Sequence, residues 1–146
     1  DEIVVLEANL DDLTGEVVGY VYDRLFDAGA LDVFTSSIYM KKNRPATQLT
    51  VLVPPALREA MEEILFAETT TFGVRAHSAQ RRKLTRVSET VQTAVGPIRI
   101  KVGYRRGAVV TVSPEFEDCR AAARQSGRPL SDVMTLAIQQ WHAERK

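Results

Sequence analysis

The sequence predicts an α+β fold, with a ferredoxin-like βαββαβ sandwich followed by a β-hairpin, a short strand and two C-terminal helices. Over residues 3–82, short β-branched runs alternate with segments whose apolar residues recur three and four positions apart. Residues 83–104 contain strongly alternating stretches, and the chain after Ser113 returns to helical spacing. We therefore expect two subdomains, 1–82 and 83–146, that together make one domain.

The elements of the first subdomain follow from propensity, spacing and turn residues. Thr14 is a good N-cap for the first helix, Gly29 ends it, and Pro54-Pro55 open the second helix. The expected order is a strand at 3–9, a helix at 14–28, strands at 30–40 and 48–53 joined by a turn at 41–45, a helix at 56–67 and a strand near 72–82. This order is typical of an antiparallel sheet with two helices on one face.

The second subdomain is expected to begin with a hairpin. Its elements are strands at 84–95 and 98–104 joined at Gly96-Pro97, a short strand at 109–112, a helix between Ser113 and Gly127, and a last helix at 130–141. We expect Ser113 to cap the first of these helices, with Pro114 at its first position. The apolar spacing of the last helix assigns Trp141 to a core or an interface.

Composition limits the possible partners. The chain of 146 residues is 45% hydrophobic, and its 19 Lys and Arg residues balance 19 Asp and Glu, so no overall field would hold it on nucleic acid or a membrane. The single cysteine, Cys119, excludes an intrachain disulfide and a cysteine-rich zinc site, and no apolar run approaches the roughly 20 residues that span a bilayer. Without a signal-peptide pattern, a cytoplasmic protein is expected, and a start at Asp1 is compatible with a piece of a longer chain.

An acidic turn between the first strand and the first helix is the first candidate site. Asp11, Asp12 and Glu16 could supply hard oxygen ligands to Mg²⁺ or Mn²⁺, which usually take one or two carboxylates and leave other positions to water and phosphates. Acidic residues near a helix start also satisfy free N–H groups and complement the helix dipole. The sequence leaves both interpretations open.

Two further clusters supply positive charge and hydroxyl groups. They are the turn residues Lys41, Lys42 and Arg44, and the segment with Thr69, Thr70, Thr71 and Arg75 after the second helix. Lysine and arginine bind phosphate oxygens, arginine in bidentate fashion. A charged turn is also common as solvated surface, and threonines often simply precede a strand.

Together, the acidic and basic clusters suit a metal ion bound to a nucleoside triphosphate, since the cation needs carboxylates and the phosphates need Lys or Arg. Neither a Walker A motif nor G-x-G-x-x-G is present, so phosphates would be held by side chains and exposed N–H groups. Cys/His catalysis finds little support, because no motif ties His77 or His142 to Cys119.

Five segments form a recognisable set. They are E-A-N-L-D-D-L-T-G-E at 7–16, G-A-L-D-V-F at 29–34, Y-M-K-K-N-R-P at 39–45, E-T-T-T-F-G-V-R at 68–75 and P-E-F-E-D-C at 114–119. In this order, and over nearly the whole chain, they resemble the C-terminal domain of the LarC family, the nickel-insertion proteins of nickel-pincer nucleotide biosynthesis. Three of the segments contain the candidate clusters described above.

The resemblance implies a CTP-dependent nickel insertase, a lyase-type cyclometallase that inserts nickel into pyridinium-3,5-bisthiocarboxylic acid mononucleotide with CTP hydrolysis and so matures the nickel-pincer cofactor of lactate racemase. It implies CTP with Mn²⁺ or Mg²⁺ as cofactors, nickel as the inserted metal, and the mononucleotide and an N-terminal domain of the same protein as partners. The implied roles are Asp11, Asp12 and Glu16 near the metal, Lys41, Lys42 and Arg44 on the phosphates, and Thr69, Thr70, Thr71 and Arg75 as second choices. The isolated domain would be incomplete for nickel insertion.

A second class of function stays open from the sequence, namely a ferredoxin-like oligomerisation module or a small-ligand regulatory module without chemistry of its own. An open sheet with alternating strands favours self-association, so a homo-oligomer is expected. Such a module would bind its ligand without a divalent metal and would not cleave a triphosphate.

Overall fold

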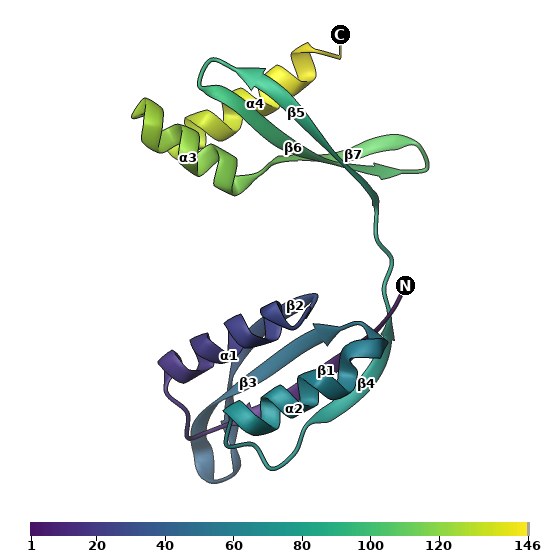
Figure 1. The fold of residues 1–146 in the computed structure, drawn as a ribbon, viewed down its shortest axis with the longest axis vertical. Helices are drawn as coiled ribbons and strands as arrows, with labels where there is room; N and C mark the ends of the chain where they lie inside the picture. Colours follow the sequence, from purple (N-terminus) through teal and green to yellow (C-terminus); the bar gives the residue numbers. More distant parts are fainter. Residues whose placement is uncertain (146) are drawn as a thin grey trace. The chain divides into compact units, whose positions relative to one another are not determined.

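The computed structural model describes residues 1–145, which divide into two compact units between Arg82 and Lys83. We call residues 1–82 the N-terminal unit and the residues from 83 onward the C-terminal unit, and Figure 1 shows the ribbon of each. Both units combine antiparallel strands with helices, so the predicted α+β class is confirmed. No helix in the described part of the chain is long and apolar enough to cross a membrane.

The N-terminal unit has the predicted βαββαβ order. Its elements are β1 (Glu2–Leu10), α1 (Gly15–Asp27), β2 (Asp32–Met40), a 3-10 turn (Lys41–Asn43), β3 (Arg44–Val53), a second 3-10 turn (Pro55–Leu57), α2 (Arg58–Glu68) and β4 (Arg75–Gln80). The strands form one sheet in the order β2-β3-β1-β4, and every neighbouring pair is antiparallel. This is the order expected of a ferredoxin-like sandwich, and α1 and α2 lie on one face of the sheet (Figure 1).

Alternation along β1 builds the core of the N-terminal unit. Leu6, Ala8 and Leu10 are buried in the core against the helices, whereas Glu7 and Asn9 between them lie on the other, open face of the sheet. The helices complete this core with the buried side chains of Val21, Leu25, Met61 and Leu65. Burial of the apolar face of β1 therefore fixes the register that also sets the positions of its polar residues.

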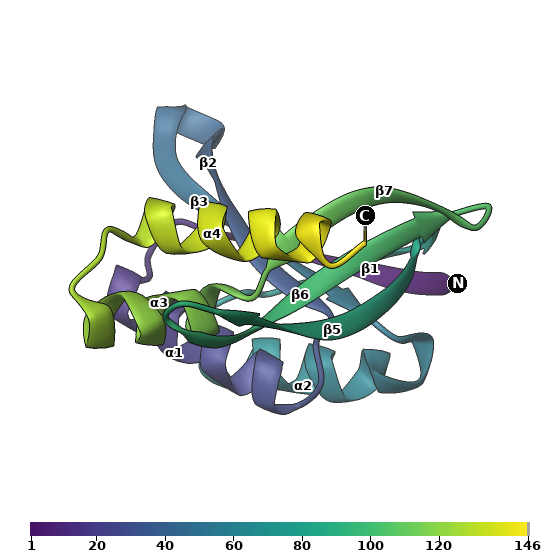
Figure 2. The same cartoon turned by 90° about the horizontal axis from the view of Figure 1, so that it is seen from above.

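The strand register brings three connections to one end of this sheet. Leu10 at the end of β1 pairs with Thr47 near the start of β3, and Arg75 at the start of β4 pairs with Glu7. This end, which we call the loop end, therefore contains the β1–α1 connection (11–14), the β2–β3 turn (41–43) and the α2–β4 connection (69–74). Figure 2 shows the β2–β3 hairpin projecting from the sheet.

The C-terminal unit is a three-stranded sheet with two helices. Its elements are β5 (Thr85–Thr93), β6 (Gly96–Arg105), β7 (Ala108–Pro114), α3 (Phe116–Ser126) and α4 (Leu130–Ala143). The strand order is β5-β6-β7 with antiparallel pairs, and both helices lie on one face of the sheet (Figures 1 and 2). Trp141 is buried in this core, as predicted, and its Nε1 donates a hydrogen bond to Glu89 Oε2 at 2.7 Å.

The predicted position of the β5–β6 turn was wrong. The turn lies at Ala94-Val95, and Gly96 and Pro97 already belong to β6. Gly96, with φ 106°, closes the turn opposite Thr93, whose Oγ1 accepts a hydrogen bond from the backbone N–H of Val95 at 3.2 Å. Pro97 is tolerated in a central strand because β7 pairs with β6 only from Ile100 onward.

The predicted start of α3 was also wrong. Ser113 and Pro114 are the last residues of β7, and α3 begins at Phe116 with Glu115 in the N-cap position. Pro114 ends an edge strand, a place where a missing N–H costs little. The end of α3 is as predicted, because Gly127 adopts the left-handed conformation with φ 69°.

Candidate functional site

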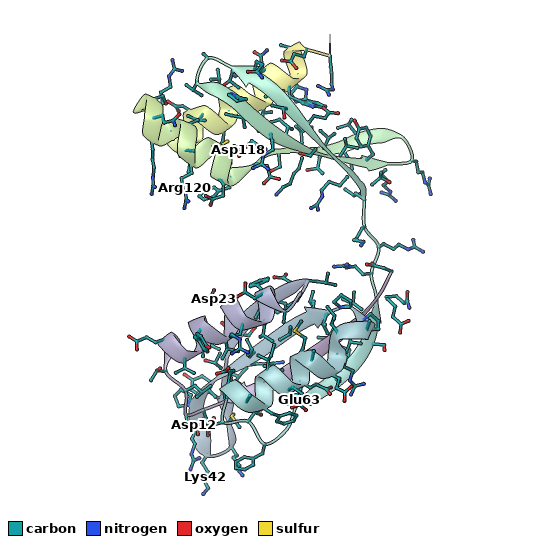
Figure 3. All side chains as sticks on the ribbon, in the orientation of Figure 1. Asp12, Asp23, Lys42, Glu63, Asp118 and Arg120 are labelled. Atoms are coloured by element: carbon teal, nitrogen blue, oxygen red, sulfur yellow. The ribbon has the colours of Figure 1, made fainter. Side chains whose placement is uncertain are left out.

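Three loops, one acidic, one basic and one uncharged and rich in threonine, are joined at the loop end of the N-terminal unit. Arg44 Nη1 donates to Asp11 Oδ2 at 3.4 Å, which links the β2–β3 hairpin to the β1–α1 connection. Thr70 Oγ1 donates to Asp12 Oδ1, which links the α2–β4 connection to the same segment. Figure 3 shows Asp12 and Lys42 at this end of the unit. The acidic turn is therefore the centre of a cluster drawn from all three loops.

The β2–β3 turn holds its lysines in an uncommon backbone conformation. Lys42 and Asn43 have φ values of 60° and 55°, in the left-handed region that a lysine rarely adopts. Lys41 and Lys42 are exposed and make no hydrogen bond or ion pair with any of residues 1–145. Their ammonium groups are thus available to an anion, whereas the guanidinium of Arg44 is shared with Asp11.

The α2–β4 connection is a turn held by its own hydroxyl groups. Thr69 Oγ1 donates to the Leu65 carbonyl at 2.6 Å, and Thr71 Oγ1 donates to the Gly73 carbonyl at 2.8 Å. The backbone N–H of Thr71 donates to Thr69 Oγ1 at 3.2 Å. These two hydroxyls serve the backbone, so Thr70 is the threonine of this turn that contacts the acidic turn. The turn also explains why β4 is shorter at its start than the predicted strand.

Arg75 lies on the open face of the sheet rather than beside the lysines. Its Nη2 donates to Asn9 Oδ1 at 2.9 Å, and its Nε donates to Glu7 Oε2 at 3.3 Å. Gln48 Nε2 donates to the other oxygen of Glu7 at 2.6 Å, which completes a network across β3, β1 and β4. The sequence analysis missed this network, because only the strand register shows that these residues are neighbours.

The acidic turn offers hard oxygen ligands without a complete metal cage. Among residues 1–145, no group of three or more His, Cys, Asp and Glu side chains is gathered closely enough to hold a metal ion. Asp11 and Asp12 each accept through one oxygen, and Glu16 in the first turn of α1 has no side-chain partner in the described chain. This donor set fits Mg²⁺ or Mn²⁺ as ions that take one or two carboxylates and complete their shell with phosphate and water.

The conspicuous acidic and cysteine residues of α3 have a structural role. Asp118 accepts hydrogen bonds from the backbone N–H, Nε and Nη2 of Arg99, at 2.9, 2.8 and 2.7 Å. Cys119 is buried, and burial raises the pKa of its thiol, which lowers the fraction of reactive thiolate. Cys119 is therefore a small buried side chain in the core of the C-terminal unit.

Two aromatic side chains near the loop end are exposed, and the sequence analysis did not single them out. Tyr39, close to the β2–β3 turn, is 79% exposed, and Phe72 in the α2–β4 connection is fully exposed. The available signal was a phenylalanine between threonine and glycine, outside any amphipathic pattern.

Comparisons with known proteins extend over both units. The model of a family described as nickel insertion protein matches residues 1–134. A relative from Gloeobacter violaceus is 49% identical over 146 residues, which are 99% of this chain and 35% of that protein. The pyridinium-3,5-bisthiocarboxylic acid mononucleotide nickel insertion protein of Desulfitobacterium hafniense is 46% identical over 132 residues, which are 90% of this chain and 33% of that protein. The chain thus spans about a third of the length of these relatives.

Solved structures are also similar to the chain. One is LarC2, the C-terminal domain of a cyclometallase involved in the synthesis of the NPN cofactor of lactate racemase, in its apo form. It superposes with a TM-score of 0.93 at 40% identity, covering 97% of this chain and 98% of that domain. Another is a protein of Methanopyrus kandleri, with a TM-score of 0.69 at 27% identity, covering 94% of this chain and 86% of that one.

Proposed function

This chain belongs to the nickel insertion protein family, and we propose that it binds CTP with Mn²⁺ or Mg²⁺ at the loop end of its N-terminal unit. In the whole protein, this binding serves the insertion of nickel, the substrate metal, into pyridinium-3,5-bisthiocarboxylic acid mononucleotide with hydrolysis of CTP. The name of the relative from Desulfitobacterium hafniense supports the insertion reaction. The resemblance of the loop motifs to the LarC family supports CTP as the nucleotide.

The observation that carries the proposal is the meeting of both charge types at one end of the sheet. The Arg44–Asp11 pair joins the basic turn to the acidic turn, and the two lysines beside it have no partner in the described chain. A triphosphate with its metal ion needs both kinds of group within the span of one ligand. The exposed lysines Lys41 and Lys42 are the groups best placed for the phosphates.

The residues of the acidic turn would hold the ion through Asp11, Asp12 or Glu16, and the ion would offset part of the triphosphate's negative charge. In this proposal, the lysine ammonium groups bind and orient the phosphates, and the carboxylates of the acidic turn hold the ion. Positive side chains fixed around a triphosphate also stabilise charge that develops on its oxygens during cleavage. Positioning and electrostatics, rather than a side-chain nucleophile, are the contribution of these loops.

In the relatives, about two thirds of the length lies outside the part that this chain matches, and the proposal also assigns a role to that part. We propose that nickel insertion requires that portion, an N-terminal domain, and that the chain described here contributes nucleotide binding. The expected homo-oligomer stays a prediction, and the open face of the N-terminal sheet is where we expect self-association.

Calorimetry of the 146-residue chain with CTP, ATP and GTP tests the proposal, first with Mn²⁺ and then with EDTA. We expect CTP to bind more tightly than ATP and GTP, and we expect EDTA to abolish the binding. Binding that persists in EDTA would indicate a metal-independent regulatory module instead, and an absence of binding to all three nucleotides would contradict the proposed site.

Two substitutions at the loop end sharpen this test. Lys41→Ala should weaken CTP binding about 10-fold or more, because a charge-assisted contact to phosphate is lost, and should change stability by no more than about 0.5 kcal/mol. Asp12→Asn should reduce the difference between the CTP affinity measured with Mn²⁺ and that measured with EDTA. The matched control is Arg58→Ala at the opposite end of the unit, which removes an exposed cation paired with Glu62 and should leave binding unchanged. Normal CTP affinity of Lys41→Ala would remove the turn from the site.

A further inference from the structure

The side chain of Phe72 is the most exposed large apolar group in the described chain, with a relative accessibility of 106%. Large aromatic side chains normally contribute their area to a core or an interface, and isolated full exposure leaves that area in water. Other exposed phenylalanines of the unit are covered by about half, such as Phe26 at 46% and Phe66 at 48%. Phe72 therefore differs from the ordinary surface aromatics of the same unit.

The backbone that carries Phe72 is held firmly. The hydroxyl of the preceding Thr71 donates to the carbonyl of the following Gly73 at 2.8 Å, so a side-chain hydrogen bond encloses Phe72. The N–H of Gly73 donates back to the same hydroxyl at 3.3 Å, and Thr69 anchors the turn to the end of α2 at 2.6 Å. A ring presented by such a turn loses little conformational freedom when it binds a flat ligand.

Phe72 lies at the same end of the sheet as the charged cluster. Phe72 is two residues after Thr70, whose hydroxyl contacts Asp12, and its connection lies at the same end of the sheet as the two unpartnered lysines. The loop end therefore combines groups for phosphate, groups for a hard cation and exposed aromatic faces, of which that of Phe72 is more exposed than that of Tyr39. A nucleotide is a ligand that has a matching part for each of them.

We propose that Phe72 is the stacking surface for the base of the bound nucleoside triphosphate. The inference rests on the proposed function and assigns the base, in addition to the phosphates, to a residue of the chain. Every base has a π-face, so the ring contributes affinity for the base moiety and leaves the choice among bases to polar groups. Phe72 is thus a binding residue that positions the nucleotide, with no part in bond cleavage.

The test compares a ligand with a base and a ligand without one. Binding of CTP and of inorganic tripolyphosphate, each with Mn²⁺, is measured by calorimetry on the 146-residue chain and on three variants. Phe72→Leu removes the aromatic face but keeps an apolar side chain, Phe72→Trp enlarges the face, and Phe26→Leu is the control at the far end of α1. Thermal unfolding of each variant confirms that the fold is retained.

We expect Phe72→Leu to weaken CTP binding about 5- to 100-fold, as for loss of one base–aromatic stack, while tripolyphosphate binding is unchanged. Phe72→Trp should restore CTP affinity, and its added indole fluorescence should be quenched by CTP but not by tripolyphosphate. Phe26→Leu should bind both ligands normally.

Three results would overturn the inference. Unchanged CTP affinity of Phe72→Leu would show that no stacking occurs while the phosphate site stands. Equal weakening of CTP and tripolyphosphate would show that Phe72 acts only by supporting the turn. Failure of the unmodified chain to bind either ligand would overturn the proposed function and this inference together. The first two results, by contrast, would overturn only the inference about Phe72.

Discussion

The two units of the chain carry opposite net charge and use their charged side chains differently. The N-terminal unit has 8 basic and 13 acidic residues, a net charge of −5, and the C-terminal unit has 11 and 6, a net charge of +5. In the C-terminal unit, cations of β6 pair with the start of α3, as Arg99 with Asp118 at 2.7 Å and Lys101 with Glu115 at 2.9 Å. At the loop end of the N-terminal unit, the two lysines of the β2–β3 turn have no such partner among the described residues.

The proposed phosphate site lies in the acidic unit, so under this proposal net charge is a poor guide to where an anion binds in this chain. The acidic unit carries the candidate phosphate site because its turn lysines are unpaired, and local potential depends on such groups more than on the sum. In the basic unit, several cations form ion pairs that join the helices to the sheet. Their ion pairs assign Arg99 and Lys101 a structural role, whereas Lys41 and Lys42 are left available to a ligand.

The largest expected effect concerns the aromatic cluster of the C-terminal unit. Trp141 is buried, donates to Glu89, and lies under the guanidinium of Arg145, whose central carbon is 4.0 Å from the ring centroid. Trp141→Ala should lower the free energy of unfolding of this unit by about 3–5 kcal/mol. Hydrogen exchange of the β5 and α4 amides measures the loss. Tyr39→Ala is the control, since its exposed ring should contribute no more than about 0.5 kcal/mol to the free energy of unfolding. Equal losses of stability in the two variants would contradict the expected difference between a buried and an exposed aromatic ring.

The elements of both units could be predicted because periodicity and caps act locally. Thr14 accepts from the N–H of Val17 at 3.4 Å, as its position before an amphipathic run predicts. Two of the misplaced boundaries, the β5–β6 turn and the start of α3, involve prolines, which are ambiguous as local signals. Proline has no backbone N–H, so Pro97 and Pro114 can lie in a strand only where no neighbouring strand requires a donor at that position. The ladder between β6 and β7 decides where that is, and it is not visible in the sequence.

The candidate site could be predicted as a set of charged turns, but its internal pairing could not. The sequence places the Asp11-Asp12 pair, Arg44 and Thr70 in three separate connections. The antiparallel register brings Arg44 to Asp11 and Thr70 to Asp12. The same register turns Arg75 toward Glu7 on the open face. Sequence spacing identifies which residues occupy the loop end, while sheet geometry determines which of them neutralise each other.

The second expected effect is a dependence of the stability of the C-terminal unit on pH. Hydrogen bonds from the side chain of Arg99 hold the pKa of Asp118 at about 2, below its usual 3.8. Because the folded pKa is depressed, the stabilisation is complete above the unfolded value and is lost as pH falls from about 4 toward 2. Asp118→Asn should cost about 1 kcal/mol at neutral pH, a modest figure because the Arg99 side chain is 57% exposed.

Urea denaturation between pH 6 and pH 2 checks this dependence. The stability difference between the unmodified chain and Asp118→Asn should shrink over the window from pH 4 to pH 2. Glu117→Gln is the control, because Glu117 pairs with Arg120 along the exposed surface of α3 and should contribute little at any pH. A difference that stays constant down to pH 2 would mean that the Asp118 carboxylate is not what joins α3 to β6.

The smallest expected effect on stability is at Lys42 and has the opposite sign. With φ 60° and ψ 27°, Lys42 carries the cost of a β carbon in the left-handed region, which glycine avoids. Lys42→Gly should therefore raise the free energy of unfolding by about 0.5 kcal/mol, after its greater freedom in the unfolded chain is subtracted, while CTP affinity falls with the lost ammonium group. Lys42→Ala retains the β carbon and should lose the same affinity without gaining stability. Equal stability of the two variants would mean that the turn stores no strain, and normal affinity in both would mean that this lysine, though unpaired, does not contact the nucleotide.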